Sequence, residues 1–169
     1  MASRTLISVE EYLRTSYRPD CDYVDGEVLE RNVGETDHSW LQKKIILYLG
    51  IREQQLGICV LPEERVQVKA DRYRVPDICL VLGTKPEEQV LSKPPFLCIE
   101  ILSPEDRMSR IRERTDDYLV MGVPYIWVLD PIAQRAWSVT PAEGLREVMD
   151  GILRTQSPSI EVPLAELFS

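Results

Sequence analysis

The chain has 169 residues, of which 44% are hydrophobic and 28% charged, a balance typical of one folded domain rather than a disordered or fibrous protein. Its apolar runs are short and its first residues lack the apolar stretch of a secretory signal, so we expect no membrane span and a cytoplasmic protein. The net charge of −8 disfavours broad, non-specific nucleic-acid binding, which relies on neutralising phosphates. A local basic stripe, or a site where a divalent cation supplies the positive charge, remains compatible with it.

The four cysteines stand at positions 21, 59, 79 and 98 and form no CxxC pair. Cys79 and Cys98 lie within strand-like apolar runs, where a free cysteine behaves as a small apolar residue. We therefore expect buried, reduced thiols rather than disulfides or a zinc site, which fits a reducing compartment.

The first part of the chain predicts a helix, a hairpin and a second helix. Ser8 followed by Glu11 is a helix-capping pattern, and residues 22–30 hold an Asp-Gly turn between two strand-like halves. Asp37 is expected to cap the second helix, in which apolar residues recur at helical spacing until Gly57.

Three strands are predicted next. Residues 58–61 and 65–68 indicate one strand or a bent pair, and residues 74–82 indicate a second strand whose apolar tail is buried on both faces. After a polar loop, residues 96–102 indicate the third strand.

A further helix and strand complete the predicted core. Ser103 and Pro104 are typical of a helix start, and Gly122 of a helix end. The residues expected on the inward face of this helix are Met108, Ile111, Thr115, Tyr118 and Leu119. Residues 123–131 predict a fourth strand, parallel to the third because a helix connects the two. The remainder indicates an edge hairpin around residues 137–139 and a loosely packed C-terminus.

This order of elements predicts an α/β fold with a central mixed sheet flanked by helices. We expect a single domain over residues 1–169, with its core at about residues 36–140. The N-terminal helix and hairpin form an extension to that core.

Two acidic residues interrupt the predicted core strands. Asp77 follows a proline at a strand start, and Glu100 stands in the apolar run Leu-Cys-Ile-Glu-Ile-Leu. A buried acid is costly unless something pairs with it, and two on neighbouring strands repel unless a cation lies between them. Each acid taken alone is more simply a strand cap or the partner of an arginine such as Arg74. The two together favour a site for Mg²⁺ or Mn²⁺.

Three further residues join the candidate site. Arg114 lies on the inward face of its helix and can reach Glu100. It is explained equally well as a structural ion pair or as a catalytic group. His38, the only histidine, is a capping or packing residue unless its helix directs it toward the sheet end. Asp22 in the early hairpin is the weakest candidate, since acids before turns are common.

The segments around these residues resemble one known family. They are Arg-Val-Pro-Asp ending at Asp77, Ile-Glu-Ile-Leu-Ser-Pro around Glu100, and Gly-Val-Pro followed by Tyr-Ile-Trp-Val-Leu-Asp-Pro at residues 122–131. Together with Tyr-Val-Asp-Gly-Glu-Val at residues 23–28, they resemble the Uma-type family of restriction-endonuclease-like proteins, within the PD-(D/E)xK nuclease superfamily. The resemblance covers roughly residues 5 to 140.

The resemblance implies a Mg²⁺-dependent endonuclease that hydrolyses phosphodiester bonds in DNA, with Asp77 and Glu100 as metal ligands. The superfamily's usual lysine, two residues after the glutamate, is Leu102 here, and the Uma-type lysine position on the following helix is Arg114. Asp22 matches the family's early acidic position. Arginine does not lose its proton, so Arg114 could stabilise charge or orient water but could not act as a general base.

Two other functions remain open at this point. A catalytically silent nuclease-fold module that binds DNA or a protein is favoured by Arg114 and by the net charge of −8. A two-carboxylate sugar hydrolase would need a deep pocket and stacking aromatic residues, which no cluster in the sequence supplies. The apolar C-terminal part, with Trp127 and Trp137, suggests a homodimer as a possible partner arrangement.

Overall fold

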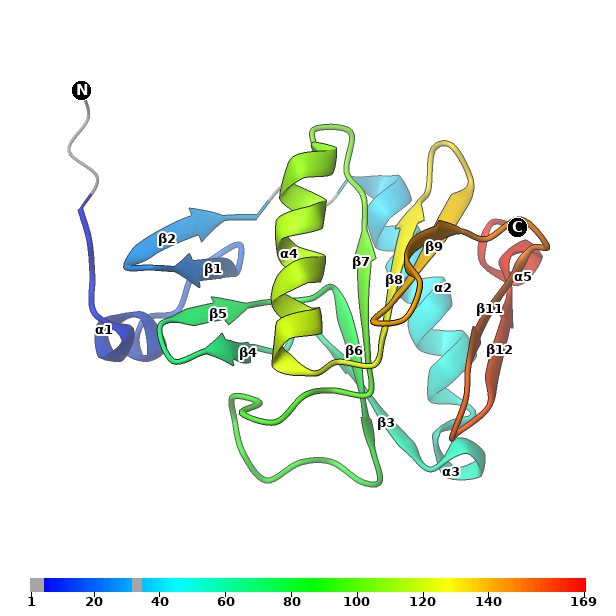
Figure 1. Ribbon diagram of the computed structural model, residues 1–169, viewed down its shortest axis with the longest axis horizontal. Coiled ribbons are helices and arrows are strands. Elements are labelled where there is room, and N and C mark those ends of the chain that lie inside the picture. The colour runs from blue at the N-terminus through cyan, green and yellow to red at the C-terminus, as the bar shows by residue number, and fades with distance from the viewer. Residues whose placement is uncertain (1–4, 32–34) are drawn as a thin grey trace.

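A six-stranded sheet in the order β10-β9-β8-β7-β6-β3 organises the computed structural model, which describes residues 5–31 and 35–169 (Figure 1). Only β7 and β8 run parallel, so the sheet is mixed, as the helix between these two strands predicts. The strands are β3 (Ile58–Pro62), β6 (Ile78–Leu82), β7 (Leu97–Ile101), β8 (Tyr125–Asp130), β9 (Arg135–Thr140) and β10 (Gly144–Glu147).

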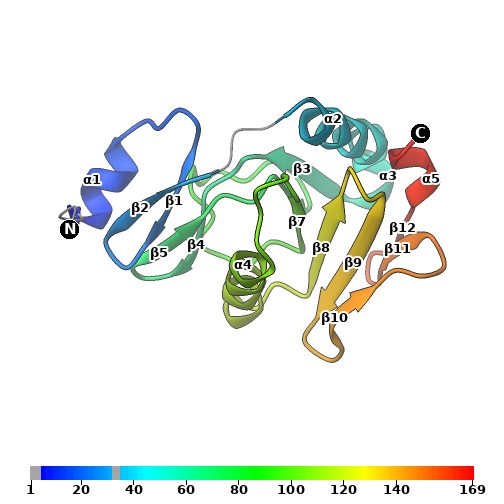
Figure 2. The same cartoon turned by 90° about the horizontal axis from the view of Figure 1, so that it is seen from above.

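Two helices cover opposite faces of this sheet. Figure 2 shows α2 (Thr36–Gly50) on one side and α4 (Met108–Met121) on the other. Alternate strand residues divide between the two faces: Leu97 and Ile99 pack in the cluster that holds Leu41 of α2, whereas Cys98 packs with Tyr118 of α4. Because successive strand residues point to opposite faces, an apolar run such as 97–101 is buried on both sides.

The N-terminal hairpin joins two later strands, from residues 66–74, in a second sheet of order β2-β1-β5-β4, beside α1 (Val9–Arg14). Its strands are β1 (Cys21–Val24), β2 (Glu27–Glu30), β4 (Val66–Lys69) and β5 (Arg72–Arg74). Ser8 caps α1 by accepting a hydrogen bond from the Glu11 N–H at 3.1 Å. Asp25 and Gly26, with φ of 50° and 92°, make the tight turn of the hairpin. The predicted helix and hairpin are both confirmed.

The segment predicted as one strand over residues 74–82 is instead divided between the two sheets. β5 ends at Arg74 and β6 begins at Ile78, and residues 75–77 carry the chain across. Pro76 has no N–H to donate to a strand ladder, which suits it to this crossing. In the same way β3 and β4, the predicted bent pair, belong to different sheets.

The helix boundaries also differ from those predicted. α2 begins after Glu35, so Asp37 lies in its first turn and is not its cap. The helix stops at Gly50, and a separate short helix, α3 (Glu53–Leu56), precedes Gly57. The last part of the predicted helix is therefore a different element.

The start of α4 lies later than predicted. Ser103 donates its N–H and its hydroxyl to Asp106, at 2.7 and 2.9 Å, and so stabilises a turn rather than a helix start. Met108, predicted to face inward, is about half exposed, whereas Ile111, Thr115 and Tyr118 are buried as expected. The helix ends at Gly122, in the left-handed conformation, as predicted.

The C-terminal part is firmly packed, contrary to expectation. β9 and β10 form the predicted edge hairpin, but β11 (Ile152–Thr155), β12 (Ile160–Pro163) and α5 (Leu164–Leu167) add a second hairpin and helix. Leu153, Ile160, Val162 and Leu167 are buried in the same cluster as α2. Of the two tryptophans that suggested a homodimer, Trp127 is buried and Trp137 is partly exposed, and the homodimer stays a prediction.

All four cysteines are free thiols, and those at 21, 79 and 98 are buried, as expected. Across residues 5–31 and 35–169, no helix combines the length and the apolar character needed to cross a membrane.

Candidate active site

Asp77 and Glu100 stand next to one another where the two sheets meet. Ile78 pairs with Ile99 in the antiparallel ladder of β6 and β7, so the next register position brings together Asp77, just before β6, and Glu100 within β7. Their side chains belong to residues that are only 2% and 3% exposed. Two carboxylates buried at adjacent positions require positive charge close by.

Each oxygen of Asp77 is occupied. Oδ2 accepts a hydrogen bond from the Ile101 N–H at 2.7 Å. Oδ1 is ion-paired with Arg31, which directly follows β2, and lies 3.3 Å from Nε2 of His38 in the first turn of α2. Burial alone would raise the pKa of Asp77, but the His38 hydrogen bond and the Arg31 charge outweigh it and lower that pKa. The same contact raises the pKa of His38 despite its burial.

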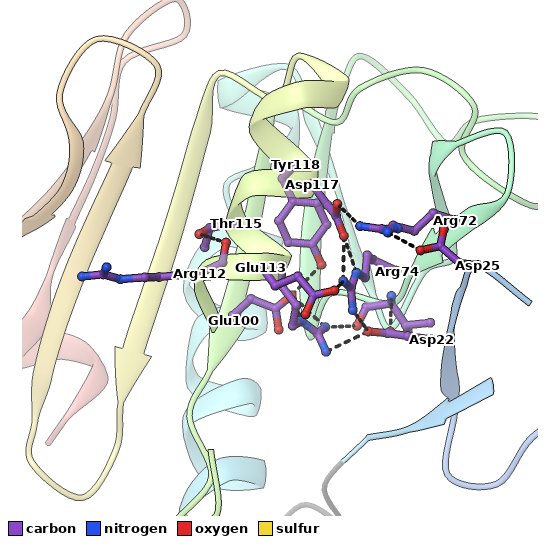
Figure 3. Close-up of polar contacts among 12 residues, drawn as sticks. Asp22, Asp25, Arg72, Arg74, Glu100, Arg112, Glu113, Thr115, Asp117 and Tyr118 are labelled. Carbon is purple, nitrogen blue, oxygen red and sulfur yellow. Dashed lines mark hydrogen bonds and ion pairs between the residues drawn. The ribbon is translucent and has the colours of Figure 1, made fainter. Parts of the chain in front are cut away.

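Glu100 is held through a single oxygen. Arg114 donates to Oε1 from Nε at 3.2 Å and from Nη2 at 2.9 Å. The Tyr118 hydroxyl donates to the same atom at 2.5 Å (Figure 3). No donor to Oε2 is present among residues 5–31 and 35–169. Burial raises the pKa of Glu100 to about 7; the charge of Arg114 lowers it and that of Asp77 raises it. Glu100 therefore keeps one carboxylate oxygen available to a ligand.

Arg114 joins Glu100 to Asp22 on β1. Its Nη1 lies 3.1 Å from Oδ2 of Asp22, and its Nη2 also donates to the Val75 carbonyl at 2.9 Å. Asp22 in turn accepts the Val75 N–H at 2.9 Å. Every nitrogen of the Arg114 guanidinium thus has an acceptor within the chain, which makes Arg114 a clamp between the two sheets.

A second buried arginine lies behind this clamp. Arg74, the last residue of β5, donates to Asp117 from Nε at 2.7 Å, to Asp22 from Nη1 at 3.1 Å and to Glu113 from Nη2 at 3.1 Å (Figure 3). Asp117 is also bound by Arg72 at 2.8 Å. Arg74 therefore pairs with the acids around the site, and no bond joins it to Asp77 or Glu100 in the described part of the chain.

All five residues singled out in the sequence lie in this region. Asp77, Glu100, Arg114 and His38 line one small cavity of about 30 Å³, and Asp22 is connected to it through Arg114. Arg31 and Tyr118 were not predicted as site residues. Arg31 carries no pattern of its own, and its place next to Asp77 arises from tertiary structure alone; Tyr118 shares the inward stripe with Arg114, a signal that could have identified it.

A larger cleft of about 520 Å³ adjoins the small cavity. The two share Arg31, His38 and Asp77, and the wall of the cleft on the side of the N-terminal extension is made by residues 16–20. Asp77 is thus reached from a cleft between the extension and α2, and Glu100 from the small cavity that adjoins it.

The donor set fits a divalent cation such as Mg²⁺, which is commonly bound by one or two carboxylates with water completing its shell. Asp77 and Glu100 face one cavity, and Glu100 Oε2 lacks a donor. In the described residues, no cluster of three or more His, Cys, Asp or Glu side chains is arranged to hold a metal. A cation here would therefore rest on the two carboxylates.

The mixed sheet between α2 and α4, with a buried Asp just before β6 and a buried Glu in the neighbouring β7, has the restriction-endonuclease-like α/β fold. The model of the Uma2 family, described as "Putative restriction endonuclease", matches residues 9–167, and the chain belongs to this family.

The fold has a counterpart among solved structures. A crystal structure described as a "putative nuclease" from Anabaena variabilis ATCC 29413 superimposes with a TM-score of 0.82 at 20% sequence identity, over 96% of this chain and 97% of that one. This likeness establishes the fold. No curated protein matches the chain.

Proposed function

We propose that the protein is a Mg²⁺- or Mn²⁺-dependent endonuclease that hydrolyses phosphodiester bonds in DNA. The observation that carries this proposal is the pair of adjacent buried carboxylates, Asp77 and Glu100, facing one cavity next to a cleft. Membership of a family described as restriction endonuclease points to the same chemistry.

Asp77 and Glu100 would hold the cation. When bound, the cation supplies Lewis acidity: it polarises the phosphate and lowers the pKa of a water molecule. The chain's own residues prepare this site. The Ile101 N–H fixes Asp77 through Oδ2, and Arg114 and Tyr118 fix Glu100 through Oε1, so Oε2 of Glu100 would be the oxygen that holds the cation.

Arg114 is assigned a positioning role in this proposal. Its guanidinium binds Glu100, Asp22 and the Val75 carbonyl, so it acts on the reaction through the carboxylates it holds. Asp22 completes the clamp on the side of the N-terminal extension. His38 lines both the small cavity and the cleft, where it can orient a phosphate or a water molecule.

Nicking of supercoiled plasmid DNA tests the proposal. The isosteric variants Asp77→Asn and Glu100→Gln should each lower the Mg²⁺-dependent rate by roughly 100-fold or more, since each removes charge that holds the cation. Glu143→Gln, which removes an acid from an exposed turn, serves as the matched control and should cleave like the wild type. Equal residual cleavage by both site variants would point to a contaminant or to another site.

A catalytically silent module that binds DNA or a protein is the second candidate. It is favoured by one observation: each site carboxylate is already paired with an arginine of the chain, Asp77 with Arg31 and Glu100 with Arg114. A Mn²⁺ titration without measurable heat, together with no cleavage, would favour this candidate over the nuclease.

A further inference from the structure

Oδ1 is the oxygen of Asp77 that meets Arg31 and His38, the two basic residues that line both the small cavity and the cleft. Oδ2 is used by the Ile101 N–H at 2.7 Å. Oδ1 receives Nη2 of Arg31 and lies near Nε2 of His38. A metal ion bound by Asp77 would therefore have to share Oδ1 with the Arg31 guanidinium or replace it.

Sharing is disfavoured by charge and by space. The cavity between Asp77 and Glu100 measures about 30 Å³, roughly the room for a single ion or water molecule. The Arg31 side chain is 12% exposed, so water screens it little. A divalent cation and a guanidinium on one carboxylate oxygen in such a place repel each other strongly. Metal binding thus requires Arg31 to leave Oδ1.

The space open to a displaced Arg31 is the adjoining cleft. Arg31 lines both the small cavity and the cleft of about 520 Å³, and His38 and Arg18 also line the latter. A guanidinium freed from its carboxylate presents a planar fork of donors that matches a phosphate group. The cleft is the route by which a phosphodiester would reach Asp77.

We propose that Arg31 is an exchangeable counter-ion. It neutralises Asp77 until a divalent cation takes its place, and it then binds a backbone phosphate of the nucleic acid in the cleft. This inference rests on the proposed function. It adds that metal and nucleic acid bind cooperatively, since each favours the position of Arg31 that the other requires.

Titration calorimetry with Mn²⁺ on the full chain provides the first measurement. Arg31→Gln removes the competing cation, so this variant should bind Mn²⁺ about tenfold more tightly than the wild type, a difference of about 1.4 kcal/mol. Arg18→Gln is the matched control. It removes the same charge from the same cleft but from an exposed residue, and it should change the Mn²⁺ affinity far less.

Fluorescence anisotropy with a labelled DNA duplex, in Ca²⁺ to slow hydrolysis, provides the second measurement. Arg31→Gln should weaken DNA binding about tenfold, opposite in direction to its effect on Mn²⁺, and Arg31→Lys should fall between it and the wild type. Opposite shifts support the exchange, because damage to folding would weaken both kinds of binding.

The outcomes separate this inference from the proposed function. If the wild type binds Mn²⁺ and Arg31→Gln binds it equally or more weakly, Arg31 is a structural ion pair and the inference alone is overturned. If Arg31→Gln binds Mn²⁺ but the wild type does not, the exchange is supported in its strongest form. If neither protein binds Mn²⁺, the metal site itself is refuted, and the inference falls with it.

Discussion

Replacement of Arg74 by methionine is expected to destabilise the protein severely. The residue is 3% exposed, and its guanidinium binds Asp22, Asp117 and Glu113. Methionine keeps much of the side-chain length but removes all the donors. Asp22 and Asp117 would remain buried with one fewer cation each.

The size of the effect follows from these partners. Removing one member of a buried ion pair costs about 3–5 kcal/mol, because the remaining charge is left in a site of low polarity. Here Asp22 keeps Arg114 and Asp117 keeps Arg72, so the lower end applies. We expect a loss of about 3 kcal/mol in the free energy of unfolding. For a chain of this length, that loss lowers the melting temperature by roughly 6–12 °C.

Urea unfolding, followed by the fluorescence of the buried Trp127 and by circular dichroism, measures this loss. Arg135→Met is the matched control, since Arg135 forms a two-point ion pair with Glu147 on the exposed surface and should unfold like the wild type. A double-mutant cycle of Arg74→Met with Asp117→Asn should give a coupling of at least about 1 kcal/mol. The reasoning is refuted if Arg74→Met unfolds like Arg135→Met, or if the cycle shows no coupling.

Two further predictions concern the site and the C-terminal hairpin. Because burial raises the pKa of Glu100 to about 7 and only the ionised form binds a cation, Mn²⁺ affinity measured by calorimetry should fall about tenfold from pH 8 to pH 6. Tyr118→Phe, which removes a hydrogen bond that favours the ionised form, should move this pH dependence to higher pH; a flat profile in the wild type would exclude Glu100 as a ligand. Leu153→Ala, at a position 0% exposed, should lower the free energy of unfolding by about 2–5 kcal/mol in urea. The exposed Ile132→Ala should change it little, and equal effects of the two substitutions would contradict the packing of the C-terminal hairpin.

Local patterns in the sequence predicted most of the elements. The capping serine at Ser8, the Asp-Gly turn and the apolar run around Glu100 each depend on interactions within a few residues, and each was correct. The errors arose where the structure depends on contacts between segments that are far apart in the sequence. The run 74–82 reads as one strand, yet the crossing between two sheets at residues 75–77 depends on partners far along the chain.

The C-terminal hairpin was misjudged for a related reason. Its apolar residues are spaced between polar ones and form no long run, so their burial depends on the presence of α2 beneath them. A sequence pattern states which residues can be buried, whereas the packing of neighbouring elements decides whether they are.

The sequence by itself identified Asp77 and Glu100 as candidate site residues, because a carboxylate inside an apolar strand is costly wherever that strand lies. It also placed Arg114 and Tyr118 on one helix face, since that spacing is local. The pairing of Arg114 with Glu100 was one of the two readings that the sequence left open, and the structure shows that ion pair. Only the tertiary structure decided that Arg31 neutralises Asp77 and that Arg74 lies behind Asp22. The physical reason is that an ion pair acts over a few ångströms in space, and these partners come from segments that are brought together only when the two sheets meet.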